Sequence, residues 1–205
     1  MTIALVAIIL AIGAGAVIAV ATREPAAAAI GLAVALVGSA LLSDPLPSAA
    51  ILSVRIVAGL LAATLVRSAA GGSERQPSPL GWPAEAFLAT AGAVAGLGVA
   101  LGLEALGGGG GLGGDPATGS AVLTVMALTT AAGTSLLVLG VAPSVHGQPG
   151  LRRAIGLVLV TQAILLIRVG IAGPPTDLEE IARAALLVAA AATGMVLARA
   201  GAAPE

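Results

Sequence analysis

Long apolar segments, separated by short polar breaks, make up most of this sequence. A helix needs about 20 apolar residues to cross the roughly 30 Å hydrocarbon core of a bilayer. Within lipid, only helices and closed barrels satisfy all their backbone hydrogen bonds. The segments that are long enough are 3–21, 26–43, 46–66, 84–104, 119–142, 151–172 and 177–198. The sequence therefore predicts an all-α integral membrane protein with seven transmembrane helices.

The composition fits burial in lipid. Only 9% of the residues are charged, against about a quarter in soluble domains, and the mean hydropathy is +1.09. Small residues are abundant and aromatic ones are almost absent, which suits helices that pack closely in a membrane. The formal net charge of −1 does not suggest a nucleic-acid partner, and without cysteine there are no disulfides or cysteine-ligated clusters.

Arginine occurs in every second connection between the segments. The intervening connections carry acidic residues, such as Asp44 and Asp115. Positive residues concentrate in cytoplasmic loops, so the pattern predicts a plasma-membrane protein with its N-terminus outside and its C-terminus in the cytoplasm. Only an odd number of spans is consistent with this orientation. The arginines on the predicted cytoplasmic side are Arg23, Arg67, Arg75, Arg152, Arg153 and Arg199.

A short internal match divides the chain. The second segment opens with Ala29-Ile30-Gly31-Leu32 and the sixth with Ala154-Ile155-Gly156-Leu157. Four residues leave both duplication and chance open, but a parallel repeat of helices 1–3 and 5–7 would fit the predicted orientation. The predicted units are a three-helix unit (1–67), a linker unit with connector helix 84–104 and a glycine-rich outer loop (68–118), and a second three-helix unit (119–205).

Arg55 is the most informative polar residue, because it falls about ten positions into segment 46–66. That places it about 15 Å into the membrane, where a charge costs from about 2.5 to more than 10 kcal/mol. No acid of the sequence is expected at the same depth. In a functional interpretation, Arg55 lies on an ion path or contacts a neighbouring subunit. In a structural interpretation, it donates hydrogen bonds to carbonyls at the end of another helix. In either case lysine should replace Arg55 better than alanine or leucine.

The other polar residues of the spans allow both structural and functional interpretations. Thr161 and Gln162 lie near the middle of the sixth segment, where glutamine commonly links helices by hydrogen bonds. A position beside a hydrated path is the alternative for Gln162.

Charges gather around the short connection before the last segment. Arg168 lies near the outer end of the sixth segment and can extend to the interface, where Asp177, Glu179 or Glu180 is its expected partner. Glu179 and Arg183 are four residues apart, a favourable helical pairing. We therefore expect ion pairs at the outer rim.

No set of residues forms a recognisable catalytic, cofactor or metal site. His146 stands alone, whereas a metal site needs several ligands. The run Gly107–Gly114 lacks the Gly-Lys-Ser/Thr ending of a phosphate loop and is predicted to be a tether. The chain is therefore not expected to be an enzyme by itself.

One stretch resembles a known group of membrane subunits. It is Arg152-Arg153-Ala154-Ile155-Gly156-Leu157-Val158-Leu159, which resembles the core of the NuoK-like subunits of complex I, cation/proton antiporters and group 4 hydrogenases. The seven predicted spans, with a basic residue in the third, are similar to the hydrogenase-4 component E subunit. Proton-translocating NuoK-like subunits carry glutamates where this chain has Val158 and the alanines 189–192. The resemblance therefore implies a structural role rather than direct proton relay.

Two functions follow as hypotheses. The first is a non-catalytic membrane subunit of a hydrogenase-4 or complex I-like redox-driven, ion-translocating complex, with the lipid bilayer and antiporter-like subunits as partners and no cofactor of its own. The alternative is a self-contained small transporter or permease-like protein, with Arg55 near a central anion site. Against the transporter hypothesis, the predicted interior of the chain has few polar groups with which to recognise a solute. A membrane anchor or assembly factor also fits the composition.

Overall fold

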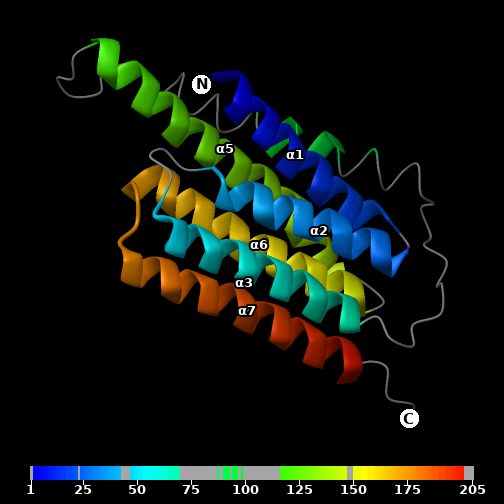
Figure 1. Cartoon of the computed structure of the whole chain (residues 1–205). Helices are drawn as coiled ribbons and strands as arrows, with labels where there is room; N and C mark the ends of the chain where they lie inside the picture. The colour runs from blue at the N-terminus through cyan, green and yellow to red at the C-terminus, as the bar shows by residue number, and fades with distance from the viewer. Residues whose placement is uncertain are drawn as a thin grey trace.

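The chain forms a bundle of helices in the computed structural model, and the predicted all-helical class is confirmed (Figure 1). The structure describes residues 2–22, 24–42, 47–69, 116–146 and 150–200, together with individual residues between 87 and 98 that are helical. The continuous helices are α1 (Thr2–Ala21), α2 (Pro25–Ala40), α3 (Ala49–Ala69), α5 (Pro116–His146), α6 (Gly150–Ala172) and α7 (Asp177–Ala200).

Four of the described helices are long and apolar enough to cross a membrane. They are Ala49–Ala69, Leu128–Val145 within α5, Gly150–Ala172 and Asp177–Ala200. Large aliphatic side chains such as Ile171, Leu178 and Val196 are exposed on these helices. A surface of this kind suits lipid rather than water, so the chain has the features of a membrane protein.

Several helix ends differ from those that the sequence predicts. The helix α3 begins at Ala49 rather than near residue 46, and α5 continues through Pro143 to His146 rather than ending near 142. Pro143 has no N–H to donate to the Leu139 carbonyl, so the helix continues with one backbone hydrogen bond fewer. The predictions that involve Arg23, Asp44, Arg75, Asp115 and the run 107–114 lie outside the described residues.

The turn between α6 and α7 determines where the charged residues of both helices meet. Gly173 has a positive φ of 84°, a conformation that glycine adopts without steric cost, and its N–H bonds to the Val169 carbonyl at 2.9 Å. Pro174 and Pro175 follow and prevent the helix from continuing. The chain therefore reverses within four residues, and the start of α7 lies beside the end of α6.

The helices form two rows, α1–α2–α3 and α5–α6–α7. Within each row neighbouring helices pack against each other, and across the rows α1 contacts α5 and α3 contacts α7. The paired helices α3 and α7 run in the same direction (Figure 1). Buried aliphatic residues form the core between the rows, with Leu32, Leu136, Ile155 and Leu159 among the most deeply buried.

Glycines bring the first two helices of each row into backbone contact. A Cβ atom on Gly31 would lie 2.6 Å from the Gly15 carbonyl oxygen, and one on Gly15 would lie 2.7 Å from that of Gly31. The helices α5 and α6 meet in the same way, because a Cβ on Gly156 would lie 2.7 Å from the Gly140 carbonyl oxygen. Small residues at such crossings allow the close approach that drives helix association in lipid.

Candidate functional site

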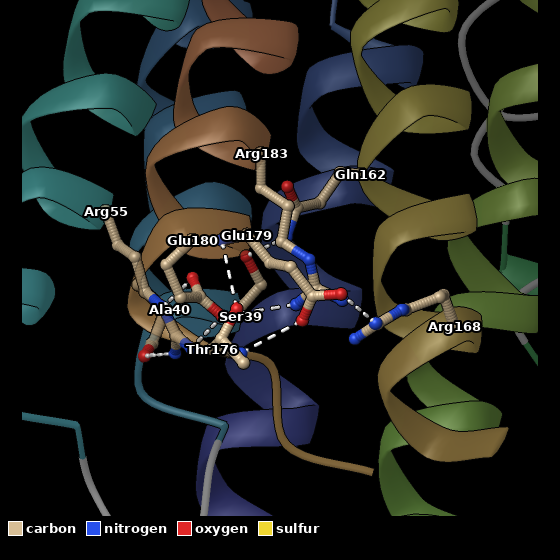
Figure 2. A network of polar contacts seen from close by, with 9 residues as sticks. All are labelled: Ser39, Ala40, Arg55, Gln162, Arg168, Thr176, Glu179, Glu180 and Arg183. Atoms are coloured by element: carbon tan, nitrogen blue, oxygen red, sulfur yellow. Dashed lines mark hydrogen bonds and ion pairs between the residues drawn. The ribbon is translucent and has the colours of Figure 1, made fainter. Parts of the chain in front are cut away.

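Charged side chains meet at one end of the bundle, where α3 and α7 begin and α2 and α6 end (Figure 2). We call Arg55, Arg168, Glu179, Glu180 and Arg183 the charged cluster. Two of its members are acids in the first turn of α7, where negative charge complements the helix dipole. The arginines come from α3, α6 and α7, so the cluster joins three helices.

Arg55, which is partly buried, and Glu180, which is buried, form a two-pronged ion pair. The Arg55 Nε donates to Glu180 Oε2 at 2.6 Å and Nη2 donates to Oε1 at 2.6 Å, with side-chain exposures of 16% and 5%. The Arg55 Nη1 also donates to the Ala40 carbonyl at 3.2 Å, at the end of α2. A parallel pair of charge-assisted bonds fixes orientation as well as distance. Arg55 therefore ties α3 to both α7 and α2.

Arg183 approaches the same carboxylate from within α7. Its Nη1 donates to Glu180 Oε1 at 3.2 Å, so that one buried carboxylate accepts hydrogen bonds from two arginines. The Arg183 Nη2 is buried and has no hydrogen-bond partner. Glu180 is therefore the central anion of the cluster, and Arg183 is the less fully bonded of its two arginines.

Glu179 belongs to a more exposed part of the cluster. It pairs with Arg168 Nη2, and the two side chains are 42% and 40% exposed. Its Oε2 accepts a hydrogen bond from the Thr176 N–H at 2.9 Å, while the Glu179 N–H donates to Thr176 Oγ1 at 3.4 Å. This reciprocal arrangement is a capping box, in which the residue before a helix and its third residue satisfy each other's amides.

A second polar contact connects the two rows of helices. Gln162 Nε2 on α6 donates to Ser39 Oγ on α2 at 2.8 Å, and Ser39 Oγ donates to the Leu36 carbonyl at 2.7 Å. Ser39 is buried. Thr161, by contrast, bonds only within its own helix, to the Leu157 carbonyl at 2.8 Å. Gln162 thus makes a helix–helix contact of the kind expected for a glutamine in a membrane span.

The structure corrects three expectations about these charges. Arg55 is the seventh residue of α3, about 10.5 Å from its start rather than 15 Å, and an acid, Glu180, lies beside it. Glu180 is buried against α3, whereas the sequence predicts an ion pair at the outer rim. Arg183 pairs with Glu180 and not with Glu179. The expectation that Arg168 pairs across the turn is met by Glu179, whereas Asp177 is exposed in the first turn.

Three hydrogen-bond partners at this site were not singled out from the sequence: Ser39, which bonds to Gln162, and the Ala40 carbonyl and Thr176, which bond to the charged cluster. A recognisable signal existed only for Thr176, since Thr176 and Glu179 match the Ser/Thr-x-x-Glu spacing of a capping box. The other two depend on which helices are neighbours, and this does not follow from local pattern.

The ion pairs of the charged cluster hold helices together, and two buried arginine nitrogens in it have no hydrogen-bond partner. Among the described residues, no group of three or more histidine, cysteine or acidic side chains is placed to hold a metal ion. The charged pairs instead hold helix ends together, and the Gln162–Ser39 bond joins α6 to α2. No family model matches the chain, and no curated protein or solved structure matches it.

Proposed function

We propose that this chain is a non-catalytic membrane subunit of a hydrogenase-4 or complex I-like redox-driven, ion-translocating complex in the plasma membrane. Its role is to scaffold antiporter-like subunits. The main support for this proposal is that the buried charged side chains bond to one another and hold helices together. Arg55 and Glu180 bond to each other and to a helix end, which stabilises the relative positions of α2, α3 and α7. A charge engaged in this way suits a rigid scaffold better than a mobile relay.

The absence of a relay set along the described helices also supports a scaffold. Proton transfer through a membrane uses carboxylates or histidines in chains, and arginine does not release its proton in the physiological range. Glu180 is the only buried acid of the described residues, and two arginines bind it. Partner subunits would therefore carry the ion path, and this subunit would seat them.

The same proposal includes seven spans, an outer N-terminus and a parallel repeat of helices 1–3 and 5–7. The glycine contacts support the repeat, because Gly31 and Gly156 occupy equivalent places in the matching tetrapeptides and each contacts the preceding helix of its row. Arg55 and Arg183 add to this support, since each is the seventh residue of the third helix in its row. Both bind Glu180.

Cysteine labelling should establish the orientation. The natural chain contains no cysteine, so single cysteines can be introduced at Thr22, at the exposed Pro174 and after Arg199 without a background signal. We expect a membrane-impermeant maleimide to label the cysteine at position 174 in intact cells, and the other two only after the membrane is opened. Labelling of all three positions from one side would contradict the seven-span arrangement.

A pull-down tests the scaffold role most directly. The tagged protein should be extracted from native membranes in mild detergent and its companions identified by mass spectrometry. We expect antiporter-like and redox subunits in stable proportion to the tagged chain. Recovery of the chain alone, or only with copies of itself, would overturn the accessory-subunit proposal.

The alternative of a self-contained transporter with an anion bound near Arg55 has less support. Three nitrogens of Arg55 are already bonded to Glu180 and to the Ala40 carbonyl. A substrate anion would have to displace a buried, two-pronged carboxylate. Among the described residues, the buried side-chain donors without partners lie instead on Arg168 and Arg183.

A further inference from the structure

Two guanidinium nitrogens of the charged cluster lack partners. Arg168 Nη1 and Arg183 Nη2 are both buried and make no hydrogen bond. Leaving a buried charged donor unsatisfied is costly, so such atoms are rare and call for an explanation. Glu179 pairs with Arg168, and Arg183 lies four residues after Glu179 on the same face of α7. Each of these two neighbouring arginines therefore has a buried nitrogen that lacks an acceptor oxygen.

Glu179 accepts a hydrogen bond from only one of the arginine nitrogens, Arg168 Nη2. Figure 2 shows its carboxylate with Arg168 on one side and the Thr176 N–H on the other. Both side chains of the Arg168–Glu179 pair are about two-fifths exposed, and ion pairs of this exposure contribute little stability. A competing anion could therefore displace Glu179 at low cost. Arg168, released from its single anchor, could then turn both terminal nitrogens to the new acceptor.

The surroundings of Arg168 favour a lipid as the source of that anion. Ile171, three residues further along the same face of α6, is 75% exposed, and Leu178, beside Glu179, is 77% exposed. Arg168 and Glu179 also lie near the ends of the apolar helices α6 and α7, where the headgroups of a surrounding bilayer are expected. A phosphate flanked by acyl chains matches arginine donors flanked by exposed aliphatic side chains.

We propose that Arg168 and Arg183 bind the phosphate of an anionic phospholipid, at a site that the Glu179 carboxylate blocks in this conformation. The lipid phosphate replaces Glu179 on Arg168 and supplies acceptors for Arg168 Nη1 and Arg183 Nη2. Glu180 stays with Arg55 and takes no part in the exchange.

Native mass spectrometry of the full chain, released from nanodiscs of mixed phosphatidylglycerol and phosphatidylcholine, tests this site. We expect the wild type to retain phosphatidylglycerol in preference to phosphatidylcholine. Arg168→Gln should lower that preference about tenfold, the loss of one charge-assisted bond. Glu179→Gln should raise it by about threefold, because it removes the competing charge. Glutamine also keeps the side-chain oxygen of the capping box.

Matched variants separate a site from a general charge effect. Arg153→Gln removes an exposed arginine near the other end of α6, and Asp177→Asn removes an exposed acid two residues from Glu179. Neither should change the preference. Retention of both lipids alike, or equal effects of Asp177→Asn and Glu179→Gln, would overturn the proposal. So would loss of phosphatidylglycerol on adding inorganic phosphate, because the site would then take free phosphate rather than lipid.

Discussion

Replacing Glu180 with leucine is expected to destabilise the folded protein by about 3–5 kcal/mol, the cost of leaving a buried charge without its partner. The carboxylate is buried and binds both Arg55 and Arg183. Its loss therefore leaves two arginines at a helix junction without their acceptor. The measurement is the free energy of unfolding in detergent, followed by far-UV circular dichroism as SDS is added.

The structure also ranks the related variants. Arg55→Leu should cost less than Glu180→Leu, because the carboxylate keeps Arg183 as a partner. Arg55→Lys should cost least, since lysine retains the charge but loses the fork that makes two parallel bonds. Asp177→Leu, in the same turn but exposed, is the control and should change stability little. If Glu180→Leu were as stable as this control, the buried ion pair would not hold the bundle together.

The helices themselves were largely predictable from the sequence, since apolar length alone requires them. Their ends were less so. Proline at position 143 predicts a break, but α5 continues to His146 although Pro143 has no N–H to donate to the preceding turn. A start at Ala49 rather than residue 46 moves Arg55 by about 4.5 Å toward the helix end. That shift brings Arg55 level with an acid in the first turn of α7.

The pairing of Arg55 with Glu180 was not predictable for a different reason. Position within a helix can be estimated from one sequence, but the identity of neighbouring helices cannot. Glu180 follows a proline turn and begins a helix, a pattern typical of an interfacial acid. Only the packing of α3 beside α7, in the same direction, buries it against Arg55. The pairing of Arg168 across its short turn was accessible because it depends on local chain reversal.

Alanine at Gly31 or Gly156 is expected to destabilise the protein by about 1–3 kcal/mol, the usual cost of overpacking. The added methyl of Gly31→Ala would lie 2.6 Å from the Gly15 carbonyl oxygen and 2.7 Å from the Ala19 nitrogen. That of Gly156→Ala would lie 2.4 Å from the Ser144 nitrogen. Because these atoms belong to backbone, the clash is relieved only by moving whole helices apart.

Gly13→Ala is the matched control for these two variants. Gly13 lies on α1 two residues before Gly15, and a Cβ there would have no atom within 4 Å. Alanine is the better helix former, so this variant should be neutral or slightly more stable. Unfolding in SDS compares all three in one assay. Similar losses at Gly31 and Gly156 would mean that both rows depend on the same contact, as expected of a repeated unit. A loss at only one would leave the tetrapeptide match without structural meaning.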